Sequence, residues 1–193
     1  MANTNAPFGF RSIGRLPGAA GNFELGWRKI SGSDSAAVFN GSPVTSLSTG
    51  YIARSAPSTT VPIAGIATAF AYNSIAKGGY AWFPYWSGST ADVAAGDIDC
   101  GIINDPAAMF VVQASSAAVS FSDINALVQF VTATGNTLSG IAADSIGTID
   151  PTSSAYPFRI IGLYPDPNIS SAGIYNQAIV CFNFQDYKVL TGT

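Results

Sequence analysis

The chain has 193 residues, of which 48% are hydrophobic and only 10% are charged, and its formal net charge is −3 with no histidine. This composition excludes a disordered chain, which needs low hydrophobicity and high charge, and a basic nucleic-acid-binding protein, which needs a positive surplus. The lack of histidine excludes Ser-His-Asp catalysis in its usual form and most zinc sites.

The first thirty residues are rich in Gly, Asn and Pro and show no lasting period of two or 3.6 residues. They predict an extended arm over residues 1–30, followed by a single β domain over residues 31–193. Residues 1–54 carry five basic and two acidic side chains, whereas residues 55–193 carry three basic and nine acidic ones. The arm is therefore basic and the body acidic. The arm is also too apolar for a solvated tail, and we expect a neighbouring subunit to cover it rather than its own body.

The opening residues have neither the charged nor the apolar segment of a signal peptide. The longest apolar run, residues 61–72, is interrupted by proline, glycine and threonine and is too short to cross a bilayer. We therefore expect no membrane partner and synthesis in a cytoplasm.

Beyond residue 30, short runs of β-forming residues alternate with turn residues, which is typical of a sandwich or barrel. The clearest runs are residues 63–72, 98–103, 109–114, 156–164 and 177–184. Residues 122–131 differ, because apolar residues at 124, 127, 128 and 131 fit one face of a helix with Ser122 as N-cap, although residues 128–131 also fit a strand. The expected fold is all-β, a jelly-roll or barrel-like β-sandwich with at most one short helix at about residues 122–130.

Few side chains suggest chemistry. Cys100 and Cys181 lie in apolar runs, which predicts buried thiols. Asp97 and Asp99 would share one face of a strand, about 7 Å apart, and Asp92 lies nearby. Paired carboxylates can catalyse glycoside hydrolysis or hold Ca²⁺, but this spacing is specific to neither. We favour the interpretation that these aspartates lie at a solvent-exposed strand entry or turn. We expect no catalytic, cofactor or metal site.

The aromatic cluster at residues 80–86 (YAWFPYW) predicts a strand on which Tyr80 and Trp82 face one side and Ala81 and Phe83 the other. We expect this cluster to pack in the core rather than to be exposed for stacking on a sugar or for binding a partner's apolar pocket. The low overall charge points to a chain that buries much of its surface against other subunits, because obligate interfaces are depleted in charge.

Several segments resemble small head proteins of tailed bacteriophages, the capsid decoration or cement proteins. These segments are residues 5–11 (NAPFGFR), 14–15 (GR), 33–44 (SDSAAVFNGSPV), 156–163 (YPFRIIGL), 165–168 (PDPN) and 178–183 (AIVCFN). The resemblance implies a β-rich protein on the outer surface of the virion, bound as a homo-dimer or homo-trimer and clamping adjacent major capsid subunits. It implies no active site and no direct contact with nucleic acid.

The basic, aromatic arm agrees with this role, and the residues expected to contact the capsid are Phe8, Phe10, Arg11, Arg15 and Trp27. The main alternative is a carbohydrate-binding or host-recognition β module of a phage particle, such as a head fibre or a tail-associated protein. A groove with coplanar exposed Trp or Tyr beside Asp and Asn would favour that module. An acid-type hydrolase using Asp97 and Asp99 and the major shell protein itself are weaker alternatives.

Overall fold

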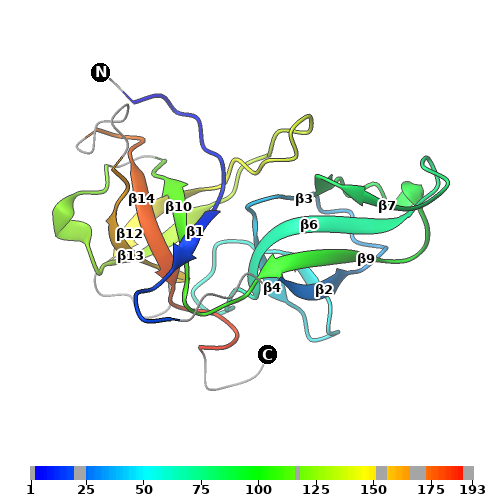
Figure 1. Ribbon diagram of the computed structural model, residues 1–193, viewed down its shortest axis with the longest axis horizontal. Coiled ribbons are helices and arrows are strands. Elements are labelled where there is room, and N and C mark those ends of the chain that lie inside the picture. The colour runs from blue at the N-terminus through cyan, green and yellow to red at the C-terminus, as the bar shows by residue number, and fades with distance from the viewer. Residues whose placement is uncertain (1–2, 20–24, 116–117, 151–155, 166–172, 189–193) are drawn as a thin grey trace.

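A computed structural model describes residues 3–19, 25–115, 118–150, 156–165 and 173–188. The protein is nearly all β and consists of two lobes that lie side by side, each built on an antiparallel sheet (Figure 1). The predicted all-β, sandwich-like class is confirmed, and among the described residues neither sheet closes into a barrel.

The first lobe contains a six-stranded sheet, which we call sheet A. Its strands, in spatial order, are β1 (Arg11–Arg15), β10 (Ala108–Gln113), β14 (Gln177–Phe182), β13 (Phe158–Leu163), β11 (Leu127–Val131) and β12 (Ser145–Asp150). Alternate side chains point into a core rich in phenylalanine. Phe10, just before β1, stacks on Phe158 with ring centroids 4.3 Å apart and is only 2% exposed. The arm segment therefore supplies part of this core.

The second lobe contains sheet B and a small two-stranded sheet. The strands of sheet B, in spatial order, are β2 (Gly26–Ile30), β9 (Val93–Ile103), β6 (Gly65–Ser74), β4 (Pro43–Ser46) and β5 (Ile52–Arg54), and β7 (Gly79–Phe83) also pairs with β6. The two-stranded sheet pairs β3 (Val38–Phe39) with β8 (Tyr85–Trp86). Inward-facing residues such as Phe70, Trp86 and Ile98 are fully buried and form a separate core.

Sheet B is inserted between two neighbouring strands of sheet A. The chain leaves sheet A after β1, builds β2 to β9, and re-enters sheet A at β10, which pairs with β1. The segment expected to be an extended arm thus contributes one strand to sheet A and one to sheet B, and the boundary expected near residue 30 falls at the end of β2. Gly26 and Ile102, near the two ends of the insertion, are paired with each other in sheet B.

Residues 122–130 do not form the continuous short helix that their spacing allows, whereas the strand alternative for residues 128–131 is confirmed. The structure has only a 3₁₀ turn, η2 (Phe121–Asp123), and residues 127–131 form β11. Ser120, rather than Ser122, caps the turn, in a capping box with Asp123. β11 lies between β12 and β13, whose backbones supply hydrogen-bond partners on both sides, and this tertiary pairing overrides the local helical spacing. A second 3₁₀ turn, η1 (Thr90–Asp92), precedes β9.

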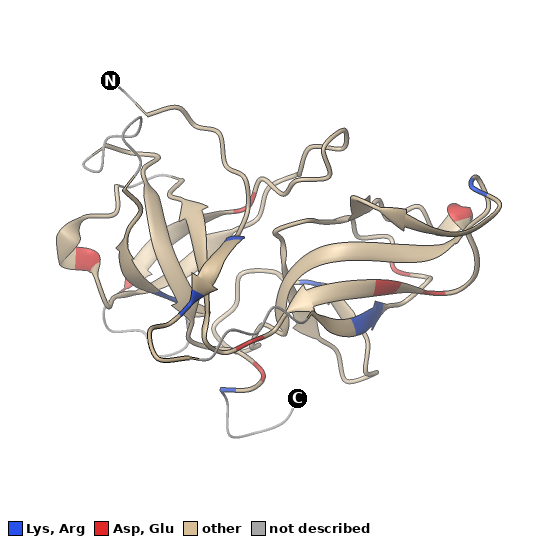
Figure 2. Cartoon of the chain, in the orientation of Figure 1, with Lys and Arg blue, Asp and Glu red and all other residues tan. Residues whose placement is uncertain are grey.

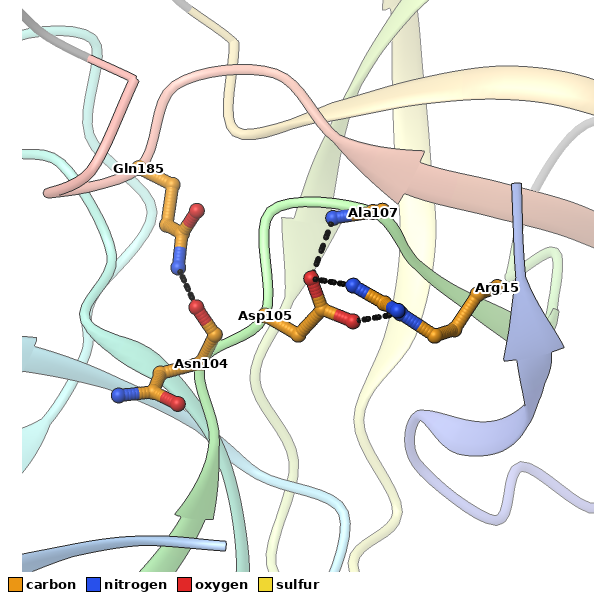
Figure 3. A network of polar contacts seen from close by, with 5 residues as sticks. All are labelled: Arg15, Asn104, Asp105, Ala107 and Gln185. Atoms are coloured by element: carbon orange, nitrogen blue, oxygen red, sulfur yellow. Dashed lines mark hydrogen bonds and ion pairs between the residues drawn. The ribbon is translucent and has the colours of Figure 1, made fainter. Parts of the chain in front are cut away.

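Polar contacts connect the lobes where the chain crosses between them (Figure 3). The Arg15 guanidinium, on β1, donates two hydrogen bonds to the Asp105 carboxylate in the link between β9 and β10. The Ala107 N–H donates to the same carboxylate at 3.0 Å. The Gln185 side chain, after β14, donates to the carbonyl oxygen of Asn104 at 2.7 Å. These bonds fix the link against β1 and against the segment that follows β14.

A second polar tie is fully buried. Asp144, in the loop between β11 and β12, is 0% exposed. Its carboxylate accepts hydrogen bonds from the Ser42 hydroxyl at 2.7 Å, the Arg54 guanidinium at 2.8 Å and the Ala133 N–H at 2.9 Å. Ser42 and Arg54 belong to the sheet B lobe, so this carboxylate connects the two lobes through their interior.

Candidate functional site

Three aromatic side chains lie exposed on the outer face of sheet B, and we call them the aromatic patch. They are Trp27 on β2 and Tyr80 and Trp82 on β7, with 52%, 55% and 65% of their surfaces exposed. Strand alternation puts them there, because Ile98 and Cys100 of the neighbouring β9 point into the core. Exposed aromatics of this size are typical of contact surfaces.

Small residues form the floor beneath the patch. Trp27 is paired with Gly101, Gly101 with Ala69, and Ala71 with Trp82. A Cβ atom at Gly101 would lie 3.4 Å from the Trp27 ring and 3.2 Å from the Ala69 methyl group, so the absent side chain lets the indole lie close to the sheet. Across this floor the two indoles meet edge to face, with ring centroids 5.6 Å apart and an interplanar angle of 69°.

The charges beside the patch neutralise each other. Asp99, on β9, accepts hydrogen bonds from the Lys29 ammonium at 2.9 Å and the Tyr80 hydroxyl at 2.8 Å. The hydrogen bond from Lys29 lowers the pKa of Asp99, and the same carboxylate raises the pKa values of Lys29 and Tyr80. Trp27, Tyr80, Trp82 and Asp99 line a pocket of about 340 Å³. This pocket combines aromatic walls with a compensated ion pair and suits a neutral or apolar occupant.

The sequence predicted correctly which residues of β7 share a side, but it predicted the wrong side to be buried. Tyr80 and Trp82 do share one side, opposite Ala81 and Phe83, yet they point to solvent rather than into the core. Trp86, from the same cluster, is fully buried. The core interpretation of Tyr80 and Trp82 failed because a strand's alternation does not say which face of its sheet is covered.

The five residues expected to contact the capsid separate into three groups. Phe10 and Arg15 are both engaged within the chain: Phe10 is a buried core residue and is withdrawn as a contact residue, and Arg15 forms an ion pair with Asp105. Phe8 and Arg11 lie together near the junction of the lobes, where the Arg11 guanidinium is 5.1 Å from the centre of the Phe8 ring. Trp27 belongs to the aromatic patch.

The three aspartates considered for catalysis or calcium each have their own set of partners. Asp92 accepts hydrogen bonds from the Tyr72 and Ser74 hydroxyls and from the Ala76 N–H. The Asp97 carboxylate accepts hydrogen bonds from Tyr51 and Gly32. The hydrogen bonds that Asp92 accepts from the Ala76 N–H and from the Ser74 and Tyr72 hydroxyls lower its pKa, whereas a general acid requires a raised pKa.

No group of three or more metal-ligating side chains occurs in the described ranges. The two cysteines are free and buried, as predicted, and burial raises the pKa of the Cys100 thiol to about 12.

The part of the chain that the structure describes contains no helix long and apolar enough to span a membrane. Figure 2 shows acidic and basic residues distributed over both lobes. No protein-family model, curated protein or solved structure matches this chain.

Proposed function

We propose that the protein is a structural virion protein, a capsid decoration or cement protein. It would bind the outside of a bacteriophage head and clamp adjacent major capsid subunits. The observation that carries this proposal is the aromatic patch, where two tryptophans and a tyrosine lie exposed on one sheet face. The segments that resemble phage head proteins and the low charge of the chain support the same function.

The patch suits a protein partner because its energy comes from apolar contact. Burying a tryptophan at the centre of an interface contributes at least about 2 kcal/mol when it acts as a hot spot. The Lys29–Asp99 pair is already satisfied within the chain, so docking does not require a matching charge at that point. The low charge further supports self-association as a homo-dimer or homo-trimer, in which each copy bridges two capsid subunits and the many contacts add by avidity.

Carbohydrate binding is the second candidate, because Asp99 lies beside Trp27 and Tyr80 in the pocket. Two observations disfavour it. The indole rings of Trp27 and Trp82 meet at 69° rather than forming a coplanar platform for sugar rings. Both oxygens of Asp99 already accept hydrogen bonds from Lys29 and Tyr80, which reduces their capacity to bind sugar hydroxyls.

The test compares binding to heads that lack the protein. Wild type, the double variant Trp27→Ala/Trp82→Ala and the control Phe121→Ala are co-sedimented with such heads, after circular dichroism confirms that each is folded. Phe121 is 80% exposed in η2, in the sheet A lobe, so its removal matches the loss of an exposed aromatic elsewhere. We expect wild type and the control to bind alike and the double variant to bind at least about thirtyfold more weakly.

Two results would contradict the proposal: absence of wild-type binding to heads, or equal binding by the double variant. Saturable binding of the isolated protein on a glycan array, lost in the double variant, would instead support the carbohydrate module. Light scattering of the purified protein measures its oligomeric mass, and a strictly monomeric protein would contradict the dimer or trimer.

A further inference from the structure

A second surface lies where the two lobes meet, and we call it the junction pocket. It has a volume of about 280 Å³. Phe8, Ile103 and Ile141 provide apolar walls, while Arg11 and Thr68 add polar groups. The walls come from the segment that leads into β1 and its first residues, from the turn before β4, from β6 and the end of β9, and from the loop between β11 and β12. Both lobes therefore contribute to the pocket.

Arg11 gives this pocket its chemistry. It is the one charged residue among those that line the pocket. Its guanidinium lies over the Phe8 ring, a cation–π contact. Arg15, Arg54 and Lys29 form ion pairs with carboxylates, but within the described ranges no carboxylate pairs with Arg11.

A guanidinium held in this way selects an anion of a particular shape. Stacking on an aromatic ring leaves the edge of the guanidinium free, and that edge presents paired N–H donors that fit both oxygens of a carboxylate. The apolar walls suit the methylene groups of an Asp or Glu side chain. A polyanion such as nucleic acid fits less well, because a single arginine stands on a chain whose net charge is −3.

The junction pocket lies close to the aromatic patch. Thr68, in its lining, donates a hydrogen bond at 3.0 Å to the carbonyl oxygen of Gly101, the residue beneath Trp27. The two features are thus joined through the paired strands β6 and β9. We propose that the junction pocket binds the carboxylate of an Asp or Glu side chain presented by the protein that docks on the aromatic patch. The identity of that partner as the capsid rests on the proposed function, whereas the carboxylate chemistry rests on Arg11.

The first experiment tests the carboxylate chemistry without any capsid. The isolated protein is titrated with N-acetyl-glutamate N-methylamide while the Arg11 Nε–Hε resonance is followed by NMR. We expect a saturable shift of that resonance, with no shift for the glutamine analogue at the same concentrations. A resonance that moves equally with both compounds, or with neither, would overturn the proposal.

The second experiment measures binding to heads as a function of salt. Arg11→Gln is compared with Lys77→Gln, which makes the same change of charge at an exposed position in the hairpin between β6 and β7. We expect Arg11→Gln to weaken binding about tenfold at low salt and to reduce its salt dependence, whereas Lys77→Gln binds as wild type does. Equal binding by the two variants would contradict the carboxylate contact.

The two experiments separate the two proposals. If the glutamate probe titrates Arg11 but wild type does not bind heads, the capsid function fails and the junction pocket stands. If wild type binds heads and neither the probe nor Arg11→Gln has an effect, the junction pocket fails and the capsid function stands.

Discussion

Removing the charge partner of the buried Asp144 tests how the two lobes are held together. In Arg54→Met the side chain keeps an unbranched apolar stem and loses the guanidinium with its positive charge, while the Asp144 carboxylate stays fully buried. The carboxylate then retains hydrogen bonds only from the Ser42 hydroxyl and the Ala133 N–H. Breaking a buried pair by removing one partner costs about 3–5 kcal/mol, because the remaining charge is left uncompensated in the interior.

A second substitution separates the cost of the charge from the cost of the lost contact. Asparagine at position 144 accepts from the Ala133 N–H through its carbonyl oxygen and donates from its amide to the Ser42 oxygen, whose hydroxyl can rotate. The double variant Arg54→Met/Asp144→Asn therefore contains no buried charge at this site. We expect it to be more stable than Arg54→Met alone by at least about 1 kcal/mol.

Urea unfolding followed by tryptophan fluorescence measures the free energy of unfolding for each variant. The matched control is Lys29→Met, which breaks an ion pair whose lysine side chain is 56% exposed. It should cost less than about 1 kcal/mol, as exposed pairs do. The reasoning is refuted if Arg54→Met costs no more than Lys29→Met, or if the asparagine substitution fails to restore stability.

Three further outcomes follow from described contacts. The hydrogen bond from Arg15 lowers the pKa of Asp105 below its ordinary 3.8. The ionised Asp105 therefore stabilises the fold above that value, and this stabilisation is lost as the pH falls through the lowered pKa. Asp105→Asn should make the free energy of unfolding depend less on pH between about pH 5 and about pH 2. Gly140→Ala should lower the melting temperature more than Gly50→Ala does. Both glycines have positive φ, but only at Gly140 would a Cβ atom lie 2.5 Å from the Pro84 side chain. Equal melting temperatures of the two variants would contradict this steric explanation. The thiols, both buried, should react with a disulfide reagent only in denaturant, and rapid labelling of the native protein would contradict their burial.

The sequence predicted the strands whose composition is least ambiguous. The run expected at residues 109–114 is β10 (Ala108–Gln113), and the run expected at 177–184 contains β14 (Gln177–Phe182). Both strands are central in sheet A, with nearly continuous apolar residues bounded by turn residues. Such strands can be predicted from local composition alone, without knowing which strands pair with them.

The site was predicted less well, because exposure depends on which elements come together. Trp27 was expected on a contact surface as part of a separate arm, but it lies on a strand of sheet B beside Trp82, which was expected in the core. Their meeting depends on β6 and β9 lying between β2 and β7, a long-range pairing that no local period reveals. The burial of Phe10 was missed for the same reason, since its stacking partner Phe158 is distant in the chain.

The insertion of sheet B between β1 and β10 has an evolutionary consequence. Because the inserted segment departs from and returns to adjacent strands, its length and surface can diverge while the register of sheet A is preserved. The exposed tryptophans lie on this segment. Changes to the inserted segment can therefore remodel the exposed aromatic surface without disturbing sheet A, provided that they keep the polar ties to Asp105 and Asp144.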